Sequence, residues 1–362
     1  MKPGRGKRIF YVLAVILLAV VVLGGVLLFA APGRLATKIS VTLTSGEGTV
    51  SRRLSGRLTT FFGRPVARQV VELECRSPDE ADWSFVATEA TGILGGCSWK
   101  ILQNSDRLYR LRYAGNREYR SSESVAKTIP GLHYALKFAD EFTGSTVDTE
   151  TWTPQMPWGD HTENQLEVFV PEALTVRNGK LVITARRRPR SAGTSEYPYY
   201  SGAVSAHGTG QYNFKYGYVE TRTKMPKGMG LWPAVWLLPL DPSKDCELDV
   251  MEARGHLPQR NIMTVHFKEA SVKYPLAQSG EEYDGADMSE AYQTFGLYWS
   301  PSTLIWTRDG IERFRFTEPP RIPQTKMYLI ANLQLGDWGR TPNAKTKFPA
   351  SLFVDYIRVY QH

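Results

Sequence analysis

Three carboxylates fall within six residues of otherwise apolar sequence, at Glu247, Asp249 and Glu252. Side chains alternate between the two faces of a β-strand, so Glu252 would point away from the other two acids. One extra residue at Val250 or Met251, a β-bulge, would return it to their face. Two carboxyls on one face, a nucleophile and a general acid and base, are what retaining cleavage of a glycosidic bond requires. The alternative is an edge strand whose charges only face water.

The distance between the two glutamates sets a condition on this strand. Five residues of about 3.3 Å separate their backbones by roughly 16 Å when extended, whereas retaining carboxyl pairs lie about 5.5 Å apart. A bulge and a curved sheet must therefore bring Glu247 and Glu252 together above the shorter Asp249. Because acids this close do not ionise independently, we expect Glu252 to keep its proton and Glu247 to stay charged. Asp249 would share a proton with Glu247.

The sequence on both sides of the acidic run holds further recognisable segments. They are 140–142, 178–181, 217–220 leading into 224–226, 230–239 and 353–360. With these segments in view, residues 137–362 resemble glycoside hydrolase family 16, in its laminarinase-like branch with the bulged acidic motif. The resemblance implies an all-β jelly-roll sandwich with an open cleft. It also implies that Glu247 is the nucleophile, Glu252 the general acid and base, and Asp249 the residue that tunes the nucleophile.

The same resemblance implies an endo-acting enzyme that hydrolyses internal linkages of a β-glucan, chiefly β-1,3 linkages, with retention. Agarases and carrageenases, which cleave galactans, also carry the bulged motif. A transglycosylase that remodels envelope polysaccharide would use the same carboxylates, because only the acceptor of the covalent intermediate differs. A non-catalytic glucan receptor of this family would have lost the carboxylates, and all three are present here.

Aromatic and polar residues around the acidic run are candidates for sugar binding. Trp232 and Trp236 lie four residues apart and share one face of a strand, with core packing as their alternative role. By resemblance, Trp338, in a glycine-flanked loop, and His266 belong to the cleft, although a structural histidine is the rival interpretation of His266. Three further residues match positions that hydrogen-bond sugar hydroxyls in relatives, namely Asn164, Gln165 and Arg222.

No cofactor is expected for catalysis. The six histidines show no pair at zinc-ligand spacing, and the sequence has no phosphate loop or dinucleotide fingerprint. The resemblance implies at most a structural calcium ion on the side opposite the cleft, near Glu141, Gly179 and Asp355. Oxygen ligands suit that ion, although these residues could equally be ordinary turn and strand residues.

The N-terminus predicts a membrane anchor. Four basic residues within the first eight precede 23 uncharged residues, 9–31. That length suits a helix that crosses a bilayer with its basic flank in the cytoplasm. We therefore expect 1–31 to be a cytoplasmic tip and transmembrane helix, with the domains that follow outside the cell. A cleaved signal peptide, which would give a secreted protein, is the alternative.

Between this segment and the family-like region, residues 36–130 hold short β-branched and aromatic runs separated by Gly, Ser, Pro and Asn. This pattern predicts a small β-sandwich module, loosely immunoglobulin-like, in front of the catalytic domain at 137–362. Cys75 and Cys97 both lie in this module, where a disulfide and free thiols are open alternatives.

The charge of the chain does not predict a nucleic-acid partner. The formal net charge is +8, of which four positive charges belong to the N-terminal tip, so only +4 remains for the rest. Four arginines nevertheless cluster at 186, 187, 188 and 190. We interpret them as a solvated basic loop, with contact to an anionic polymer or lipid head group as the alternative.

Overall fold

The computed structural model describes residues 33–45, 50–162, 165–207, 212–269 and 277–362. These residues form β-strands and short 3-10 turns, and the chain divides into two compact units. The first unit takes in the chain up to residue 42 together with 55–98 and 108–127, and the second takes in 43–54, 99–107 and 128–362. The expected domain boundaries, 36–130 and 137–362, stay a prediction.

Within the described part of the chain, no helix is both long enough and apolar enough to cross a membrane. The predicted anchor at 9–31 lies outside the described residues. The prediction of a single-pass membrane protein is corrected on this finding.

The N-terminal strands form two groups. In one, β1, β2 and β5 lie side by side, and in the other β4, β3, β6 and β7 follow one another, with β8 paired to β6. Their bounds are β1 Thr37–Ser45, β2 Arg52–Thr60, β3 Val70–Arg76, β4 Ser84–Ala90, β5 Gly96–Ile101, β6 Arg107–Tyr113, β7 Ser122–Glu123 and β8 Lys127–Ile129. The small immunoglobulin-like sandwich expected at 36–130 stays a prediction.

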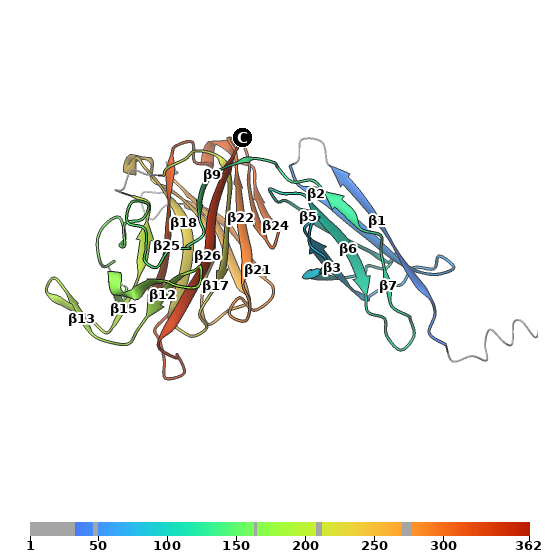
Figure 1. Ribbon diagram of the computed structural model, residues 1–362, viewed down its shortest axis with the longest axis horizontal. Helices are drawn as coiled ribbons and strands as arrows, with labels where there is room; N and C mark the ends of the chain where they lie inside the picture. The colour runs from blue at the N-terminus through green and yellow to red at the C-terminus, as the bar shows by residue number, and fades with distance from the viewer. Residues whose placement is uncertain (1–32, 46–49, 163–164, 208–211, 270–276) are drawn as a thin grey trace, which may run out of the picture. The chain divides into compact units, whose positions relative to one another are not determined.

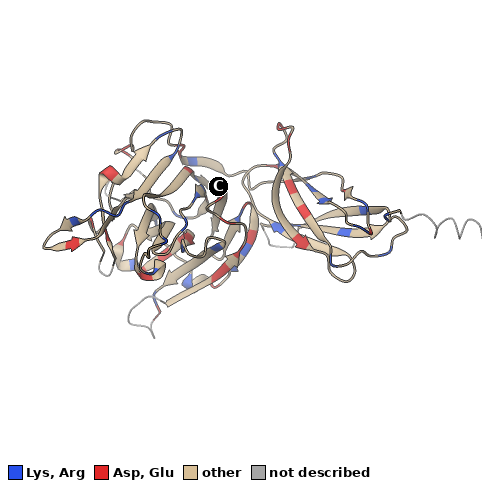
Figure 2. Ribbon diagram, turned by 90° about the horizontal axis from the view of Figure 1, so that it is seen from below, with Lys and Arg blue, Asp and Glu red and all other residues tan. Residues whose placement is uncertain are grey.

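Strand β3 shows how this part of the sequence follows the period of two. Val71, Leu73 and Cys75 are buried, whereas the glutamates between them pair across to β6. Arg110 Nε lies 2.6 Å from Glu74 Oε2, and Arg112 NH1 lies 2.7 Å from Glu72 Oε2. Figure 2 marks charges of both signs on these neighbouring strands.

No disulfide joins the three cysteines of this chain, Cys75, Cys97 and Cys246. The structure therefore contains no Cys75–Cys97 disulfide. Burial raises the pKa of Cys97 and that of Cys246 to about 12, so both thiols stay protonated.

The second unit packs two sheets face to face (Figure 1). One of them, the site sheet, has the order β16 Ala203–Ser205, β25 Met327–Leu335, β18 Leu231–Pro239, β19 Cys246–Ala253, β20 Arg260–Phe267 and β21 Ala277–Asp284. The other, the rear sheet, has the order β24 Ile311–Phe316, β23 Leu304–Arg308, β22 Gln293–Trp299, β17 Gly217–Lys224, β26 Ala350–Gln361, β12 Leu181–Ala185 and β11 Leu174–Val176, with β9 Ala135–Asp140 paired to β26.

Short elements complete this unit. The strands are β10 Glu167–Phe169, parallel to β15 Tyr199–Ser201, and the hairpin β13 Arg190–Ala192 with β14 Ser195–Tyr197. The 3-10 turns are η1 Pro171–Ala173, η2 Pro242–Lys244, η3 Pro319–Arg321 and η4 Asp337–Gly339.

The core of the second unit lies between the two sheets. Every residue of β25 is buried, which explains its nearly unbroken apolar sequence. Leu248 and Val250 of β19 belong to this core, together with Trp299 and Trp306 of the rear sheet. The predicted all-β sandwich is therefore confirmed, and strand β19 has one face in the core and the other available for a site.

Candidate active site

Strand β19 contains the predicted bulge. Against β18, Asp249 pairs with Trp236 and Met251 with Val235, so Val250 has no partner there. Against β20, the register shifts by one residue between Asp249 and Glu252. This extra residue restores Glu252 to the face of the other two acids, as the sequence predicted.

The bulge is held from the rear sheet by Trp306. Its indole Nε1 donates a hydrogen bond of 2.6 Å to the backbone carbonyl of Asp249. A bulge interrupts the ladder and leaves backbone groups in need of other partners. Because Trp306 is fully buried in β23, the sandwich core itself fixes the kinked strand. Sequence reasoning missed this residue, because its partner is a carbonyl 57 positions away along the chain.

Glu247 and Asp249 lie beside His266 of the neighbouring strand. His266 Nε2 is 3.5 Å from Glu247 Oε1 and 3.3 Å from Asp249 Oδ2. The Glu247 side chain keeps 28% of its surface exposed, whereas that of Asp249 keeps 5%. Glu247 is thus the acid within reach of a ligand, and His266 is placed in the site as predicted.

Burial is the largest cause that raises the pKa values of all three carboxyls. Burial raises the pKa of Glu247 well above its ordinary range, Asp249 adds to this shift, and His266 opposes it. Burial and Glu252 raise the pKa of Asp249 in the same way. This rise acts against the expected charge on Glu247, and His266 favours that charge. A hydrogen bond between Glu247 and Asp249 raises the pKa of Glu247 and lowers that of Asp249, and the expected sharing of a proton between them stays a prediction.

Glu252 is held by an indole. Trp232 Nε1 donates a 2.7 Å hydrogen bond to Glu252 Oε1. Burial raises the pKa of Glu252, while the bond from Trp232 and the charges of His266 and Arg254 oppose that rise. Trp232 also stacks on Trp338, with ring centroids 6.1 Å apart and planes at 14°. Trp338 keeps 42% of its surface exposed, so an aromatic platform adjoins the carboxyl of Glu252.

The loop that carries Trp338 is fixed by a buried acid that the sequence analysis did not single out. Glu167 Oε2 accepts hydrogen bonds from the backbone N–H of Leu335, at 3.0 Å, and of Leu166, at 3.1 Å. Burial raises the pKa of Glu167 to about 8. Gly336 then turns the chain with φ +101°, and a Cβ there would lie 2.9 Å from the Leu166 side chain. Only glycine suits this turn.

The other candidate residues differ in their surroundings. Gln165 bridges to Gly336 in this loop, and its buried Oε1 accepts no hydrogen bond from a described residue. Trp236 is only 8% exposed and donates a 2.7 Å hydrogen bond to Asn332 Oδ1, which favours its packing role. Its ring contacts that of Trp158, which is 48% exposed and was not predicted. Asn164 lies outside the described residues.

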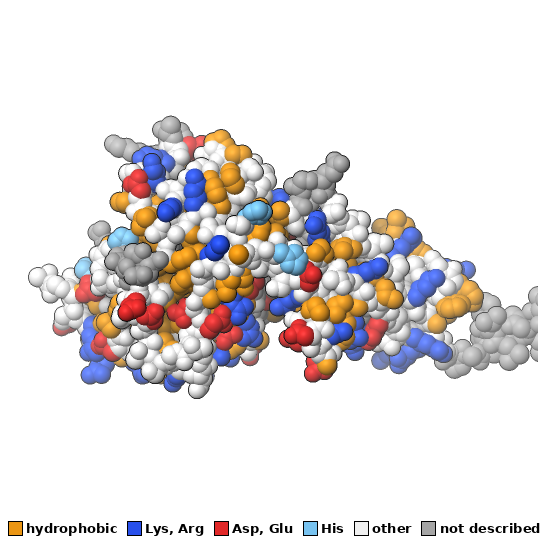
Figure 3. Space-filling view, turned by 45° about the horizontal axis from the view of Figure 1, so that its top comes forward, with side chains coloured by type: hydrophobic (Ala, Val, Ile, Leu, Met, Phe, Trp, Pro, Cys, Tyr) orange, Lys and Arg blue, Asp and Glu red, His pale blue; other side chains and the backbone are white. Residues whose placement is uncertain are grey.

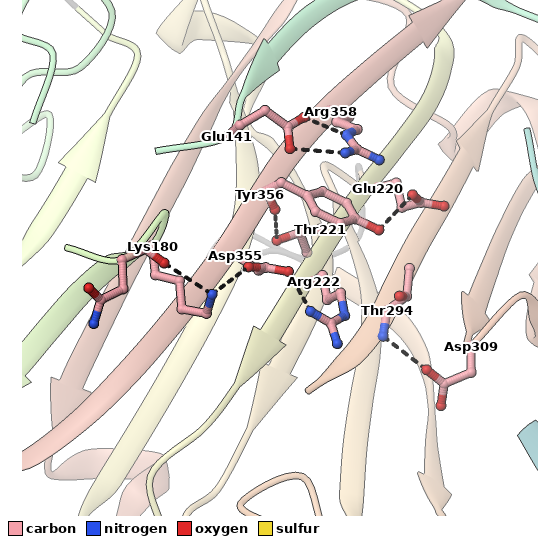
Figure 4. A network of polar contacts seen from close by, with 11 residues as sticks. Glu141, Lys180, Glu220, Thr221, Arg222, Thr294, Asp309, Asp355, Tyr356 and Arg358 are labelled. Atoms are coloured by element: carbon pink, nitrogen blue, oxygen red, sulfur yellow. Dashed lines mark hydrogen bonds and ion pairs between the residues drawn. The ribbon is translucent and has the colours of Figure 1, made fainter. Parts of the chain in front are cut away.

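Arg222 does not lie with the acidic residues. It lies on β17 of the rear sheet, where its guanidinium forms an ion pair with Asp355 (Figure 4). Its Cζ also lies 4.9 Å from the centre of the Tyr292 ring. The prediction that Arg222 binds sugar in the cleft is therefore corrected.

The predicted calcium ligands do not fit a cation. Lys180 Nζ lies 3.0 Å from Asp355 Oδ1, and Arg222 binds the other oxygen. Arg358 holds both oxygens of Glu141, at 2.6 and 2.9 Å. Figure 4 shows both carboxylates turned toward these cationic side chains. Because the carboxylates already have positive partners, the prediction of calcium at Glu141, Gly179 and Asp355 is corrected.

Among the described residues, one group could place several metal-ligating atoms around a single ion. It consists of Glu247, Asp249 and His266, whose ligand atoms lie within 4.8 Å of one another. The same closeness makes this group suited to sharing and transferring protons.

The two-sheet sandwich with a bulged acidic strand and a neighbouring indole platform defines a class of carbohydrate-active β-jelly-roll domains. Residues 134–362 match the family model described as "Beta-porphyranase A-D, GH16 domain". The chain belongs to this family of glycoside hydrolase family 16 domains, which confirms the predicted family.

Curated relatives and solved structures carry laminarinase and glucanase names. The Glucan endo-1,3-beta-glucosidase A1 of Niallia circulans is 33% identical over 272 residues, covering 64% of this chain and 38% of that protein. The Endo-1,3-1,4-beta-glycanase ExsH of Rhizobium meliloti (strain 1021) is 32% identical, covering 51% and 39%. The laminarinase catalytic domain from Thermotoga maritima MSB8 superimposes with a TM-score of 0.57 at 28% identity, covering 63% of this chain and 98% of that domain.

These comparisons confirm the jelly-roll fold of the second unit. The chain spans about two fifths of the length of the two curated relatives, 38% and 39%.

Proposed function

We propose that the second unit hydrolyses internal linkages of a β-glucan, chiefly β-1,3 linkages, with retention of configuration. The observation that carries this proposal is the bulge, which sets Glu247, Asp249 and Glu252 on one face of β19. The glucanase names of the relatives support the substrate class.

In this mechanism Glu247 is the nucleophile, because it is the acid that keeps an exposed surface. Binding of sugar moves its proton to Asp249, with which it already shares a hydrogen bond. Glu252 protonates the leaving oxygen while Glu247 attacks the anomeric carbon and forms a covalent glycosyl-enzyme. Glu252 then removes a proton from the water that hydrolyses this intermediate. Burial supports the role of Glu252, because it raises the pKa of this carboxyl and so favours its protonated form.

Sugar binding is assigned to the aromatic platform and its neighbours. Trp338 and Trp232 offer flat apolar faces on which pyranose rings stack. His266 and the free oxygen of Gln165 supply polar contacts, and Trp236 contributes through its contact with the exposed Trp158. The small module at 36–130 is proposed as an immunoglobulin-like spacer in front of the catalytic domain at 137–362.

A galactan is the second candidate substrate, because the matching family model is described as a beta-porphyranase domain. Transfer to a sugar hydroxyl in place of water is the alternative reaction, since it needs the same carboxylates.

The test is product analysis of the whole chain on laminarin, mixed-linkage glucan, agarose and porphyran. We expect internal cleavage of laminarin, with the β-anomer formed first in NMR spectra of the reaction. Cleavage of the galactans alone would move the substrate to the second candidate, and products longer than the substrate would show transfer. First formation of the α-anomer would contradict the mechanism.

A further inference from the structure

A second groove lies outside the acidic site. It has a volume of about 530 Å³, and we name it the basic groove. Its lining consists of four arginines, one acid and three cyclic or aromatic residues, namely Arg186, Arg187, Arg188, Arg190, Glu172, Tyr200, Phe348 and Pro349.

The backbone around this groove is well fixed. Arg186 follows β12 and pairs with Tyr200 of β15, with N–H to carbonyl bonds of 2.9 and 3.1 Å in both directions. Arg190 Cζ lies 4.9 Å from the centre of the Tyr200 ring. Arg187 NH2 lies 3.3 Å from the hydroxyl of Tyr199. Arg187 and Arg190 thus lie beside aromatic rings, while 187–189 form an exposed loop between paired segments, in keeping with the basic loop expected from the sequence.

The charges in the basic groove are not balanced. Glu172 is the one acid in the lining, and its Oε1 is bound to Arg190 NH2 at 2.9 Å. Within the described part of the chain, Arg186 and Arg188 are exposed and form no ion pair with a carboxylate. Guanidinium groups that repel one another in a shared groove favour an oxyanion, which accepts paired hydrogen bonds from them.

We propose that the basic groove binds a sugar unit that carries a sulfate or a carboxylate. The side chains of Phe348 and Pro349, which are not buried, offer apolar surface to the sugar ring, while Arg186 and Arg188 bind the charged substituent. This combination fits a charged glycan better than a lipid surface or nucleic acid. Figure 3 shows basic and acidic side chains interspersed on one face of the structure.

The fold connects the basic groove to the acidic site. Ala203 pairs with Asn332, Asn332 with Ala234, and Ala234 with Glu252 across adjacent strands. Tyr200 lies three residues before Ala203, so the groove lies on the order of 20 Å from Glu252, at about 4.8 Å per strand and 3.3 Å per residue. One polymer of several sugar units could reach both sites, and this part of the inference rests on the proposed function.

The experiment uses the full chain with Glu247→Gln, which leaves oligosaccharides uncut. Calorimetry compares neutral, sulfated and carboxymethylated oligosaccharides on a β-1,3-glucan and on a galactan backbone. We expect at least one charged form to bind more tightly than its neutral counterpart. Arg186→Ala with Arg188→Ala should weaken that binding about tenfold and leave neutral binding unchanged. The charged form with the higher affinity, sulfated or carboxymethylated, identifies the substituent that the basic groove binds.

A charge-matched control pair is Arg177→Ala with Lys326→Ala, two exposed residues outside the basic groove, which should leave all affinities unchanged. Arg186→Lys with Arg188→Lys keeps the charge but loses the paired donors, and should weaken binding less than alanine. An unchanged thermal midpoint shows that each variant folds.

The proposal would be overturned if charged and neutral oligosaccharides bound equally well on both glycan backbones. An equal loss of affinity in the Arg177→Ala, Lys326→Ala control pair would overturn it too. Arginine-dependent binding of anionic vesicles or RNA in place of the glycans would overturn it as well. Charged binding without hydrolysis of any glycan by the parent chain would instead contradict the proposed function and leave the groove intact.

Discussion

The site sheet and the rear sheet both carry carboxylates, but the ion pairs and the pKa values of these carboxylates differ between the two sheets. On the rear sheet, Asp355 forms ion pairs with Lys180 and Arg222, and the adjoining Glu141 forms an ion pair with Arg358. Although partial burial acts to raise it, the pKa of Asp355 is lowered by these two cations. Asp355 and Glu141 are therefore matched by positive partners.

On β19 of the site sheet, burial outweighs the charges of His266 and Arg254, and the pKa values of all three acids are raised. Unmatched acids cost stability near neutral pH, whereas matched acids contribute to it. The comparison teaches that the number of carboxylates does not identify a site. Clustered acids whose pKa values stay raised despite their positive neighbours are the better sign of a site, because such groups can share and transfer protons.

The largest expected effect is loss of the nucleophile. Glu247→Gln should lower kcat on laminarin by at least about 10³-fold, because no covalent intermediate can form. The matched change on the rear sheet, Glu141→Gln, removes an acid of the same size and should leave kcat within about twofold. Steady-state kinetics on the whole chain measure both.

Loss of the general acid gives a different pattern. Glu252→Gln should lose activity on laminarin yet still react with an aryl glycoside whose leaving group needs no proton. Azide should restore turnover and give a β-configured adduct, because it attacks a glycosyl-enzyme on Glu247. An α-configured adduct in the NMR spectrum would refute the assigned roles.

The next effect tests whether the rear sheet positions the bulge. Trp306→Phe removes the donor to the Asp249 carbonyl and should lower kcat about tenfold, with about 1 kcal/mol of lost stability. Trp299→Phe is the control, because this buried indole bonds instead to the Pro323 carbonyl at 3.0 Å. It should cost similar stability and leave kcat unchanged. Equal kcat losses in both variants would show a general packing effect.

The acidic strand was predictable from the sequence because its signal is local. The period of two and the extra residue together fixed the bulge between Asp249 and Glu252. The partners of these residues were not predictable, because they come from other strands. Trp306 lies on the rear sheet, and the bond from Trp232 to Glu252 depends on the register of β18.

The wrong assignments have the same origin. Arg222 and Asp355 each carry a chemistry that suits a ligand, and the sequence does not show that they lie within reach of each other. Lys180, which directly precedes β12, likewise forms an ion pair with Asp355, one of the proposed calcium ligands. Residue type predicts what a side chain can bind, and only tertiary pairing decides whether another side chain already binds it.

A smaller effect contrasts the stability contributed by the two sheets. Asp355→Asn should lower the free energy of unfolding at pH 7 by about 1 kcal/mol, because two cations lose their partner. The folded pKa of Asp355 is depressed, so this loss of stability should fade as the pH falls below about 4.

Asp249→Asn should instead stabilise the protein at pH 7, because the raised pKa of Asp249 makes its ionisation in the folded state costly. The gain in the free energy of unfolding from Asp249→Asn should shrink at pH values below that raised pKa, because the carboxyl of Asp249 is then protonated in the folded parent chain as well. Urea unfolding across pH tests both signs, and a stabilising Asp355→Asn would contradict the comparison.

The smallest effect concerns His266, the positive neighbour of Glu247. His266 opposes the rise in the pKa of Glu247, so His266→Ala should raise that pKa further. Because Glu247 must lose its proton to attack, the acidic limb of kcat/KM against pH should move upward by several tenths of a pH unit or more. His133→Ala is the control, since this exposed histidine pairs with Asp106 and should leave the profile unchanged. A downward or absent shift in His266→Ala would mean that its charge does not reach the nucleophile, and the site acids would then depend on burial alone.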